Sequence, residues 1–199
     1  MKLVNSIIVI ILVIFLTSCK TLQNSQLNPP SAAISPKMPA LEKNIETYSN
    51  AVVISNPMEL KVYSSEVDEN LTNPYGEKFG YISFKTTYNV TGQGMGWLLL
   101  NGFTGCVLTL FGVPLMKASF NLDVEIQITN SKHQLIGKYN GSGKAHEMVA
   151  LYWGYSMIDA QKLALTTALK NALGEIRPKI QADVARLNEE FTKAGKINY

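Results

Sequence analysis

The most regular pattern in the chain is a strict alternation of apolar and polar residues between Phe120 and Thr129. Alternation with a period of two is typical of a strand that buries one face and leaves the other in water. A sheet wetted on one side is normally antiparallel, because parallel sheets are covered on both faces and have continuous apolar runs. The apolar positions of this strand are Phe120, Leu122, Val124, Ile126 and Ile128.

Two further segments extend the predicted sheet. Phe79–Thr91 is rich in aromatic and β-branched residues and predicts a long strand. Asn130–His133 predicts a turn that leads into a strand from Gln134 to about Met148. Glycines in this last strand indicate bulges or close packing against a neighbour. They are Gly137, Gly141 and Gly143.

The best helical pattern lies between Ser156 and Ile176. Ser156 is a good N-cap, with Asp159 three residues later. Pro178 interrupts the pattern, yet helical spacing resumes after it, so we expect a kinked helix or two abutting helices. The apolar stripe comprises Ile158, Leu165, Leu169, Ala172, Leu173 and Ile176, followed by Ile180, Val184, Leu187 and Phe191.

The N-terminal part of the domain carries weaker signals. Glu42–Tyr48 favours a short helix, Ala51–Ile54 and Leu60–Tyr63 favour short strands, and the polar stretch Ser64–Lys78 favours a surface loop. Taken together, the patterns predict an α+β fold. Its antiparallel sheet has about four or five strands, is covered by a long or kinked C-terminal helix, and carries an apolar hairpin insertion.

That insertion is Gly94–Met116, a run of 23 residues without a charge. A straight helix of this length would be roughly 35 Å long, enough to cross the hydrocarbon of a bilayer. Interrupting glycines, Pro114 and several polar residues argue against a span. So does the position of the run between two strands of one sheet, because a span would put those strands on opposite sides of the membrane.

Two alternatives remain for this segment. It is either a buried hairpin or pair of short helices packed on the sheet, or a re-entrant hairpin that dips into a bilayer or contacts other copies of the chain. Under the second alternative the contact residues are Trp97, Leu98, Leu99, Leu100, Phe103, Val107, Leu108, Leu110 and Phe111.

The N-terminus has a basic start, an apolar run from Ile7 to Leu16, and small residues before a cysteine. The run is too short to span a bilayer and is typical of a secretory signal. The tetrad Leu-Thr-Ser-Cys that ends at Cys19 closely resembles the lipobox of bacterial lipoproteins, which carry a type II signal peptide. This resemblance implies removal of residues 1–18, diacylglycerol on the Cys19 thiol and an acyl group on its new amine.

Residues 19–40 are polar and contain four prolines, and they predict a disordered tether that leads to a single domain over residues 41–199. By analogy with proteobacterial sorting, Lys20 after the modified cysteine favours the outer membrane over the inner one. We therefore expect the domain to be lipid-anchored at the outer membrane and to face the periplasm.

Composition excludes some classes of partner. The formal net charge is +3, and sixteen of the eighteen basic residues are lysines scattered along the chain. Nucleic-acid binding usually needs a clustered basic patch with arginines and stacking aromatics, so we expect none. Acylation of Cys19 would leave Cys106 without a disulfide partner, and its apolar flanks predict a small buried hydrophobe.

No residue pattern indicates catalysis. The glycines of Gly92–Gly96 miss the dinucleotide-binding spacing, Gly143-Lys144 lacks the preceding glycine of a phosphate loop, and no serine lies in a Gly-x-Ser-x-Gly turn. His133 and His146 have no further zinc ligands at short spacing. We therefore predict no enzyme activity, no metal and no cofactor.

From Lys117 onward the order of strand, turn, strand, aromatic linker and helix resembles the small outer-membrane lipoproteins of the YajG-like and transport-auxiliary type. The resemblance covers about 80 residues and includes Tyr139–Gly143 and alanines at four-residue spacing from Ala160 to Ala172. It implies a strand-rich domain with packed helices at the outer membrane.

The expected function follows from the anchor and the missing motifs. We expect a lipid-anchored envelope lipoprotein that acts as a non-enzymatic assembly, scaffold or accessory subunit. The alternative is a carrier that binds lipid or another hydrophobic ligand. The expected partners are the membrane, through the N-terminal lipid, and other copies of the chain or other envelope proteins.

Overall fold

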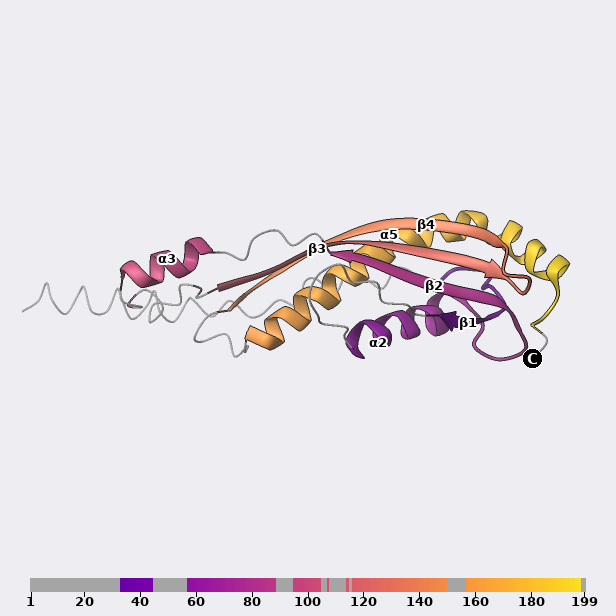
Figure 1. Cartoon of the computed structure of the whole chain (residues 1–199), viewed down its shortest axis with the longest axis horizontal. Coiled ribbons are helices and arrows are strands. Elements are labelled where there is room, and N and C mark those ends of the chain that lie inside the picture. The colour runs from indigo at the N-terminus through magenta and orange to yellow at the C-terminus, as the bar shows by residue number, and fades with distance from the viewer. Residues whose placement is uncertain are drawn as a thin grey trace, which may run out of the picture. The chain divides into compact units, whose positions relative to one another are not determined.

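The computed structural model describes residues 33–44, 57–88, 95–104, 107, 114, 116–149 and 157–197. It has an α+β fold in which a four-stranded sheet packs against a long C-terminal helix (Figure 1). The strand order is β1-β2-β3-β4. The strands are β1 (Ala40–Asn44), β2 (Lys78–Tyr88), β3 (Met116–Asn130) and β4 (Leu135–Val149). The helices are α2 (Pro57–Ser65), the π-helical turn η1 (Glu66–Leu71), α3 (Met95–Phe103) and α5 (Met157–Ala194).

The sheet is mixed rather than wholly antiparallel. β2, β3 and β4 are antiparallel as predicted, whereas β1 pairs in parallel with β2. The short helix expected over Glu42–Tyr48 is wrong for residues 42–44, which belong to β1, and the remainder lies outside the described residues. β1 has the sequence Ala-Leu-Glu-Lys-Asn, without a β-branched or aromatic residue, so only its pairing with β2 makes it a strand.

The alternation in β3 is confirmed, because its apolar residues form the centre of the core. The register places Ile126 beside Phe84 of β2 and Tyr139 of β4, so three strands contribute to one buried row. The polar residues between them form the other face of the sheet. The fully buried apolar residues of β3 are Leu122, Val124, Ile126 and Ile128.

α5 is one continuous helix of 38 residues, so the alternative of two abutting helices is wrong. Pro178 is exposed, while Ile176 and Ile180 on either side of it are buried in the core. Packing on both sides therefore keeps the helix continuous despite the hydrogen bond that proline removes. The predicted apolar stripe is confirmed except at its start, where Ile158 is 61% exposed.

Two glycines of β4 let α5 lie directly on the strand (Figure 1). A Cβ added to Gly141 would clash with the carbonyl oxygen of Ala172, and one added to Gly143 would clash with that of Ala168. The close packing predicted for these glycines is confirmed. The bulge predicted as the other alternative is found beside the third glycine, because Ile128 pairs with Gly137 while Thr129 pairs with Leu135.

Replacing Gly143 by alanine is expected to lower the free energy of unfolding by about 1–3 kcal/mol, because the new methyl group forces α5 away from β4. Chemical denaturation measures this change. Gly174→Ala is the matched control, since a Cβ there meets no heavy atom within 4 Å. Helix propensity predicts that the control is more stable by up to about 1 kcal/mol. Similar destabilisation by both substitutions would contradict the close approach.

The segment before β2 is helical, which corrects two predictions. Leu60–Tyr63, expected as a strand, belongs to α2, and Ser64–Lys78, expected as a loop, contains the end of α2 and all of η1. The strand expected over residues 51–54 lies outside the described residues. Two of the buried positions here are carboxylates, so a search for apolar spacing does not detect the helical period. The buried positions of α2 and the first turn of η1 are Glu59, Tyr63, Glu66 and Val67.

The packed domain begins before residue 41. Ile34 and Met38, inside the predicted tether, are both buried, and the Met38 amide donates to the Leu71 carbonyl at 3.0 Å. The tether prediction is therefore wrong for residues 33–40, and residues 19–32 lie outside the described residues. The proline-rich composition favoured disorder, whereas two buried side chains and backbone hydrogen bonds to η1 hold this stretch in place.

Candidate functional site

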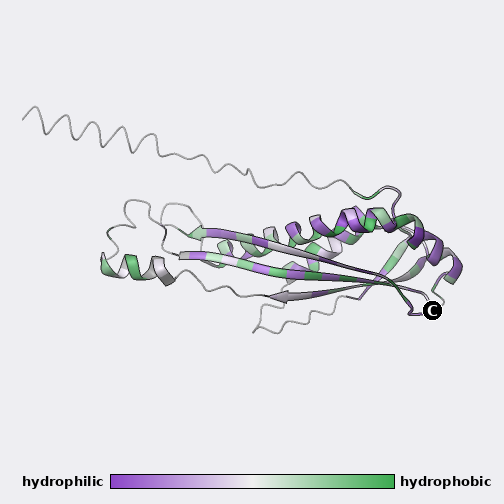
Figure 2. Ribbon diagram, turned by 90° about the horizontal axis from the view of Figure 1, so that it is seen from above, coloured by the Kyte–Doolittle hydropathy of each residue, from purple (hydrophilic) through white to green (hydrophobic). Residues whose placement is uncertain are grey.

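The charge-free segment Gly94–Met116 contains the helix α3 and four large apolar side chains that are exposed. Leu99 is 60% exposed, Leu100 44%, Phe103 91% and Val107 52%. Figure 2 shows hydrophobic residues along α3, whose sequence contains no charged residue. Single exposed apolar residues are common, but a cluster of them without charge is typical of a contact surface. We name Leu99, Leu100, Phe103 and Val107 the α3 surface.

The structure accounts for six of the nine predicted contact residues. Four of them are exposed at the surface: Leu99, Leu100, Phe103 and Val107. Two more belong to α3, where only their backbone is described: Trp97 and Leu98. Outside the described residues lie Leu108, Leu110 and Phe111, together with the predicted lipidation site Cys19.

α3 is short, and Thr104 bonds to its last turn. The amide and the hydroxyl of Thr104 both donate to the Leu100 carbonyl, at 3.2 and 2.9 Å. Nine residues make a helix of about 13 Å. In the described ranges, no helix combines the length and the apolarity needed to cross a membrane. The exposed side chains also do not fit the alternative in which the whole segment is buried.

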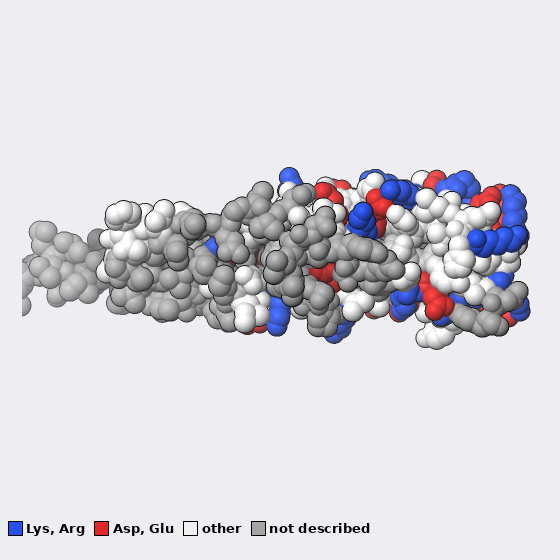
Figure 3. All heavy atoms as spheres, in the orientation of Figure 1, with Lys and Arg blue, Asp and Glu red and all other residues white. Residues whose placement is uncertain are grey.

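Charged residues occupy other parts of the described surface. In Figure 3 basic and acidic atoms gather around the C-terminal half of α5 and the β3–β4 turn. Surface ion pairs join some of them, for example Lys193 and Glu189 at 2.8 Å and Lys196 and Glu77 at 2.8 Å. The α3 surface therefore differs in chemistry from this charged part of the domain.

The wet face of the sheet has a shallow cavity of about 470 Å³, and the Glu125 carboxylate in its lining is paired. Gln127 donates to Glu125 Oε1 at 2.6 Å, and the Lys138 ammonium lies 3.0 Å from Glu125 Oε2. The bond from Gln127 and the contact with Lys138 lower the pKa of Glu125. Among the residues with described positions, no three His, Cys, Asp or Glu side chains are placed to hold a metal ion. The polar lining includes Lys85, Thr87, Asp123, Glu125, Asn140 and Ser142.

A carboxyl group that the sequence analysis did not single out is buried in α2. Glu59 is 1% exposed, and neither of its oxygens has a hydrogen-bond partner within the described part of the chain. Removal from water raises the pKa of Glu59 to about 7. One turn later, the Tyr63 hydroxyl shares a 2.5 Å hydrogen bond with the Thr86 hydroxyl, and the Tyr63 ring stacks on Phe84. Glu59 is therefore a proton-binding group inside a packed region.

A second buried carboxylate is fully paired. Glu66 of η1 is 5% exposed, and its two oxygens accept hydrogen bonds from Nε and Nη2 of Arg177 on α5. Asn70 also donates to Glu66 Oε2, at 2.9 Å. This fork-shaped pairing fixes η1 against α5. Sequence analysis missed both partners, although Arg177 is one of only two arginines in the chain.

The chain matches no known protein-family model, and no curated protein matches it either. The resemblance of residues 117–199 to the YajG-like and transport-auxiliary lipoproteins therefore stays a prediction.

Proposed function

We propose that this protein is a lipid-anchored envelope lipoprotein that works by contact, as a non-enzymatic assembly, scaffold or accessory subunit. The observation that carries the proposal is the α3 surface, an uncharged apolar patch on a domain with its own closed core. The lipobox-like tetrad that ends at Cys19 supports the anchor. A protein that works by contact needs to be held close to its partner and needs no catalytic groups. The lipid anchor would hold it there.

The anchor and the α3 surface support each other physically. The three acyl chains expected on Cys19 give stable attachment by themselves, because two membrane signals are already enough. The α3 surface would then hold the tethered domain against the bilayer or against a protein in it. The chain between Cys19 and Ala33 can reach at most about 50 Å when fully extended. A domain held at this range meets the bilayer, and proteins in it, at high effective concentration. The outer membrane, with the domain facing the periplasm, is the proposed location because Lys20 follows the cysteine.

Palmitate labelling tests the anchor. Wild-type protein is expected to incorporate labelled palmitate and to fractionate with membranes, whereas Cys19→Ala is expected to lose both properties. Cys106→Ala, which removes the other cysteine, is the matched control and is expected to label like wild type. Label retained by Cys19→Ala, or wild-type protein free in the culture fluid, would overturn the proposal.

Flotation with vesicles tests the α3 surface. A non-acylated polypeptide that starts at Thr21 is expected to bind vesicles at least about tenfold more weakly after Leu99→Asp and Phe103→Asp, since each buried side chain of this size is worth about 1.5–3 kcal/mol. The control is Leu135→Asp, because Leu135 is 55% exposed near the β3–β4 turn. Equal binding by all three polypeptides would leave the α3 surface for protein partners and would contradict a membrane contact.

The carrier alternative has less support. The cavity on the wet face of the sheet is lined mainly by polar side chains, and a second cavity in the described residues, about 240 Å³, includes Asn121, Lys144 and His146. A site for a lipid chain is expected to be apolar. Lipid found by native mass spectrometry in stoichiometric amount would favour the carrier.

A further inference from the structure

Among the residues that the structure describes, β4 is the last strand of the sheet, and its 15 residues have β3 as a neighbour on one side. The backbone groups on the other side of such a strand are a template for pairing with another chain. Proteins with a long edge strand usually shorten it, bulge it, charge it or cover it. β4 is long, and its one register shift lies at the turn end beside Gly137, so most of the strand has neither of the first two solutions.

α5 supplies side chains that bond to this free edge. Asn171, Lys179 and Arg186 donate to backbone carbonyls of β4, and Glu175 accepts from a backbone amide. The distances are 3.0 Å from Asn171 Nδ2 to Lys144 O, 2.6 Å from Lys179 Nζ to Asn140 O, 2.9 Å from Arg186 Nη1 to Ile136 O, and 2.9 Å from Ser142 N to Glu175 Oε2. We name Asn171, Glu175, Lys179 and Arg186 the edge cap.

The geometry of the edge cap follows the periodicity of the strand and of the helix. In an antiparallel pair, the backbone groups of alternate residues point away from the partner strand. Asn140, Ser142 and Lys144 are alternate residues of β4 and belong to one set, the set that points away from β3, whereas Ile136 lies at the register shift beside the turn. On the helix, three of the cap residues, Asn171, Glu175 and Lys179, recur every four residues and therefore share one side of α5.

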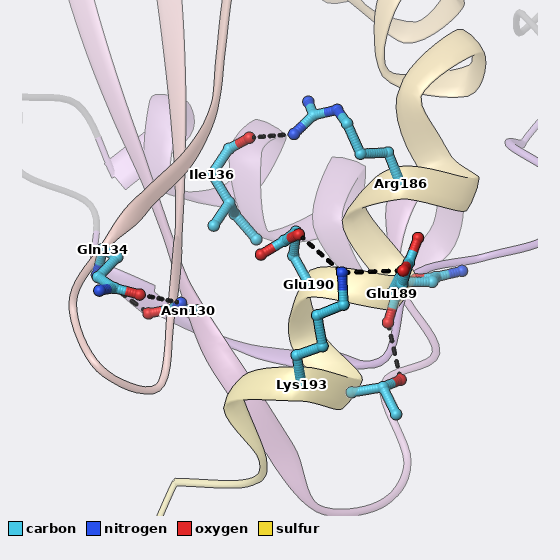
Figure 4. A network of polar contacts seen from close by, with 9 residues as sticks. Asn130, Gln134, Ile136, Arg186, Glu189, Glu190 and Lys193 are labelled. Atoms are coloured by element: carbon cyan, nitrogen blue, oxygen red, sulfur yellow. Dashed lines mark hydrogen bonds and ion pairs between the residues drawn. The ribbon is translucent and has the colours of Figure 1, made fainter.

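The chemical type of each cap residue also matches its target. The three carbonyls receive nitrogen donors, and the one amide receives a carboxylate oxygen. Arg186 is held in place by a second bond, because its Nη2 lies 2.8 Å from Asp183 Oδ2, which also accepts from the Tyr139 hydroxyl at 2.9 Å. Figure 4 shows Arg186 reaching from α5 to the Ile136 carbonyl beside the β3–β4 turn.

Gly141 and Gly143 make this reach possible. They face α5, and any side chain there would clash with helix carbonyls. A helix held further from β4 would leave Asn171, the shortest cap residue, unable to contact the strand backbone. The glycines on one face of β4 and the polar row on α5 are therefore parts of one arrangement.

We propose that the edge cap makes α5 a substitute for a fifth strand and closes β4 against pairing with a second copy of this chain. β4 is the strand that a second copy would use, since two such edges can pair with each other in antiparallel orientation over most of 15 residues. The edge cap thus restricts contacts between copies to other surfaces. It acts independently of the lipid anchor and of the α3 surface.

The test removes the edge cap and measures mass in solution. The variant carries Asn171→Ala, Glu175→Ala, Lys179→Ala and Arg186→Ala in the polypeptide that starts at Thr21. The control carries Gln161→Ala, Lys170→Ala, Glu189→Ala and Lys193→Ala, which removes the same charges and one amide from α5. We expect the cap variant to form dimers in sedimentation equilibrium at concentrations where the control keeps the wild-type mass.

Amide exchange locates the change. The Ser142 amide is expected to exchange at least about tenfold faster in Glu175→Ala than in Glu189→Ala, because only the first loses its acceptor. Should the fourfold variant unfold, Lys179→Ala with Arg186→Ala is judged by the same mass measurement. A folded cap variant that keeps the wild-type mass at every concentration overturns the proposal, and so does unchanged exchange at Ser142.

Discussion

Arg177→Ala is expected to lower the free energy of unfolding by about 3–5 kcal/mol. This is the largest effect that we expect from replacing any single polar residue of this protein. The substitution leaves the Glu66 carboxylate 5% exposed with only the Asn70 amide to bind it. An unpaired charge in such a place cannot recover its hydration. Urea denaturation at pH 7 measures the loss.

The control for this prediction is Lys193→Ala, which removes an exposed ion pair with Glu189 and is expected to change stability by less than about 0.5 kcal/mol. A double variant, Glu66→Met with Arg177→Met, is expected to recover most of the stability, because both charges are then absent. A loss below about 1 kcal/mol in Arg177→Ala would contradict the buried pairing.

The second large effect is a dependence of stability on pH through Glu59. The pKa of Glu59 is about 7 in the folded protein, against 4.5 for an unburied glutamate. Between these values the folded state holds a proton that the unfolded state has released, so stability falls as pH rises. The linkage predicts a decrease of about 3 kcal/mol from pH 4.5 to pH 7, with a plateau above that range.

Glu59→Gln is expected to remove this slope, because the amide does not titrate, while the exposed Glu69→Gln is expected to retain it. The paired carboxylates do not add to the change in stability between pH 4.5 and pH 7. The pKa values of Glu125 and Asp183 are lowered by their hydrogen bonds, so their contributions are lost only when the pH falls below the Glu59 range. Denaturation curves at half-unit steps of pH would show a slope in wild type and none in Glu59→Gln.

Sequence patterns predicted the elements whose hydrophobic period is simple. Alternation from Leu122 to Ile128 in β3 and the apolar stripe from Leu165 to Phe191 in α5 both depend on side-chain burial alone, and both are confirmed. The α+β fold follows from these two elements, since an amphipathic strand and an amphipathic helix bury each other.

The patterns failed where long-range contacts decide the structure. α2 and η1 each place a carboxylate at a buried position, Glu59 and Glu66, so the apolar spacing of a helix is not visible in the sequence. The partner that stabilises the buried Glu66, Arg177, lies 111 residues away. β1 is a strand only because β2 accepts it. The continuity of α5 through Pro178 likewise depends on packing that no local preference contains.

The candidate site was predictable only in part, because its exposure also depends on long-range packing. The absence of charge in Gly94–Met116 marked the region, but the sequence could not say which of its residues face water. Exposure of Leu99, Leu100 and Phe103 depends on how α3 packs. The edge cap had no sequence signal, because polar residues on the outside of a helix are ordinary and only their reach to β4 gives them a role.

The pairing of Glu66 with Arg177 has a consequence for the order in which the chain acquires its structure. A ribosome or a secretion channel delivers the N-terminal half first, so η1 emerges more than 100 residues before the guanidinium that neutralises it. β1 and α2 also wait for β2, which follows them. β3, β4 and α5 pack on one another and follow one another in the chain, so we expect this region to assemble first and the N-terminal third to join it after synthesis has passed residue 177.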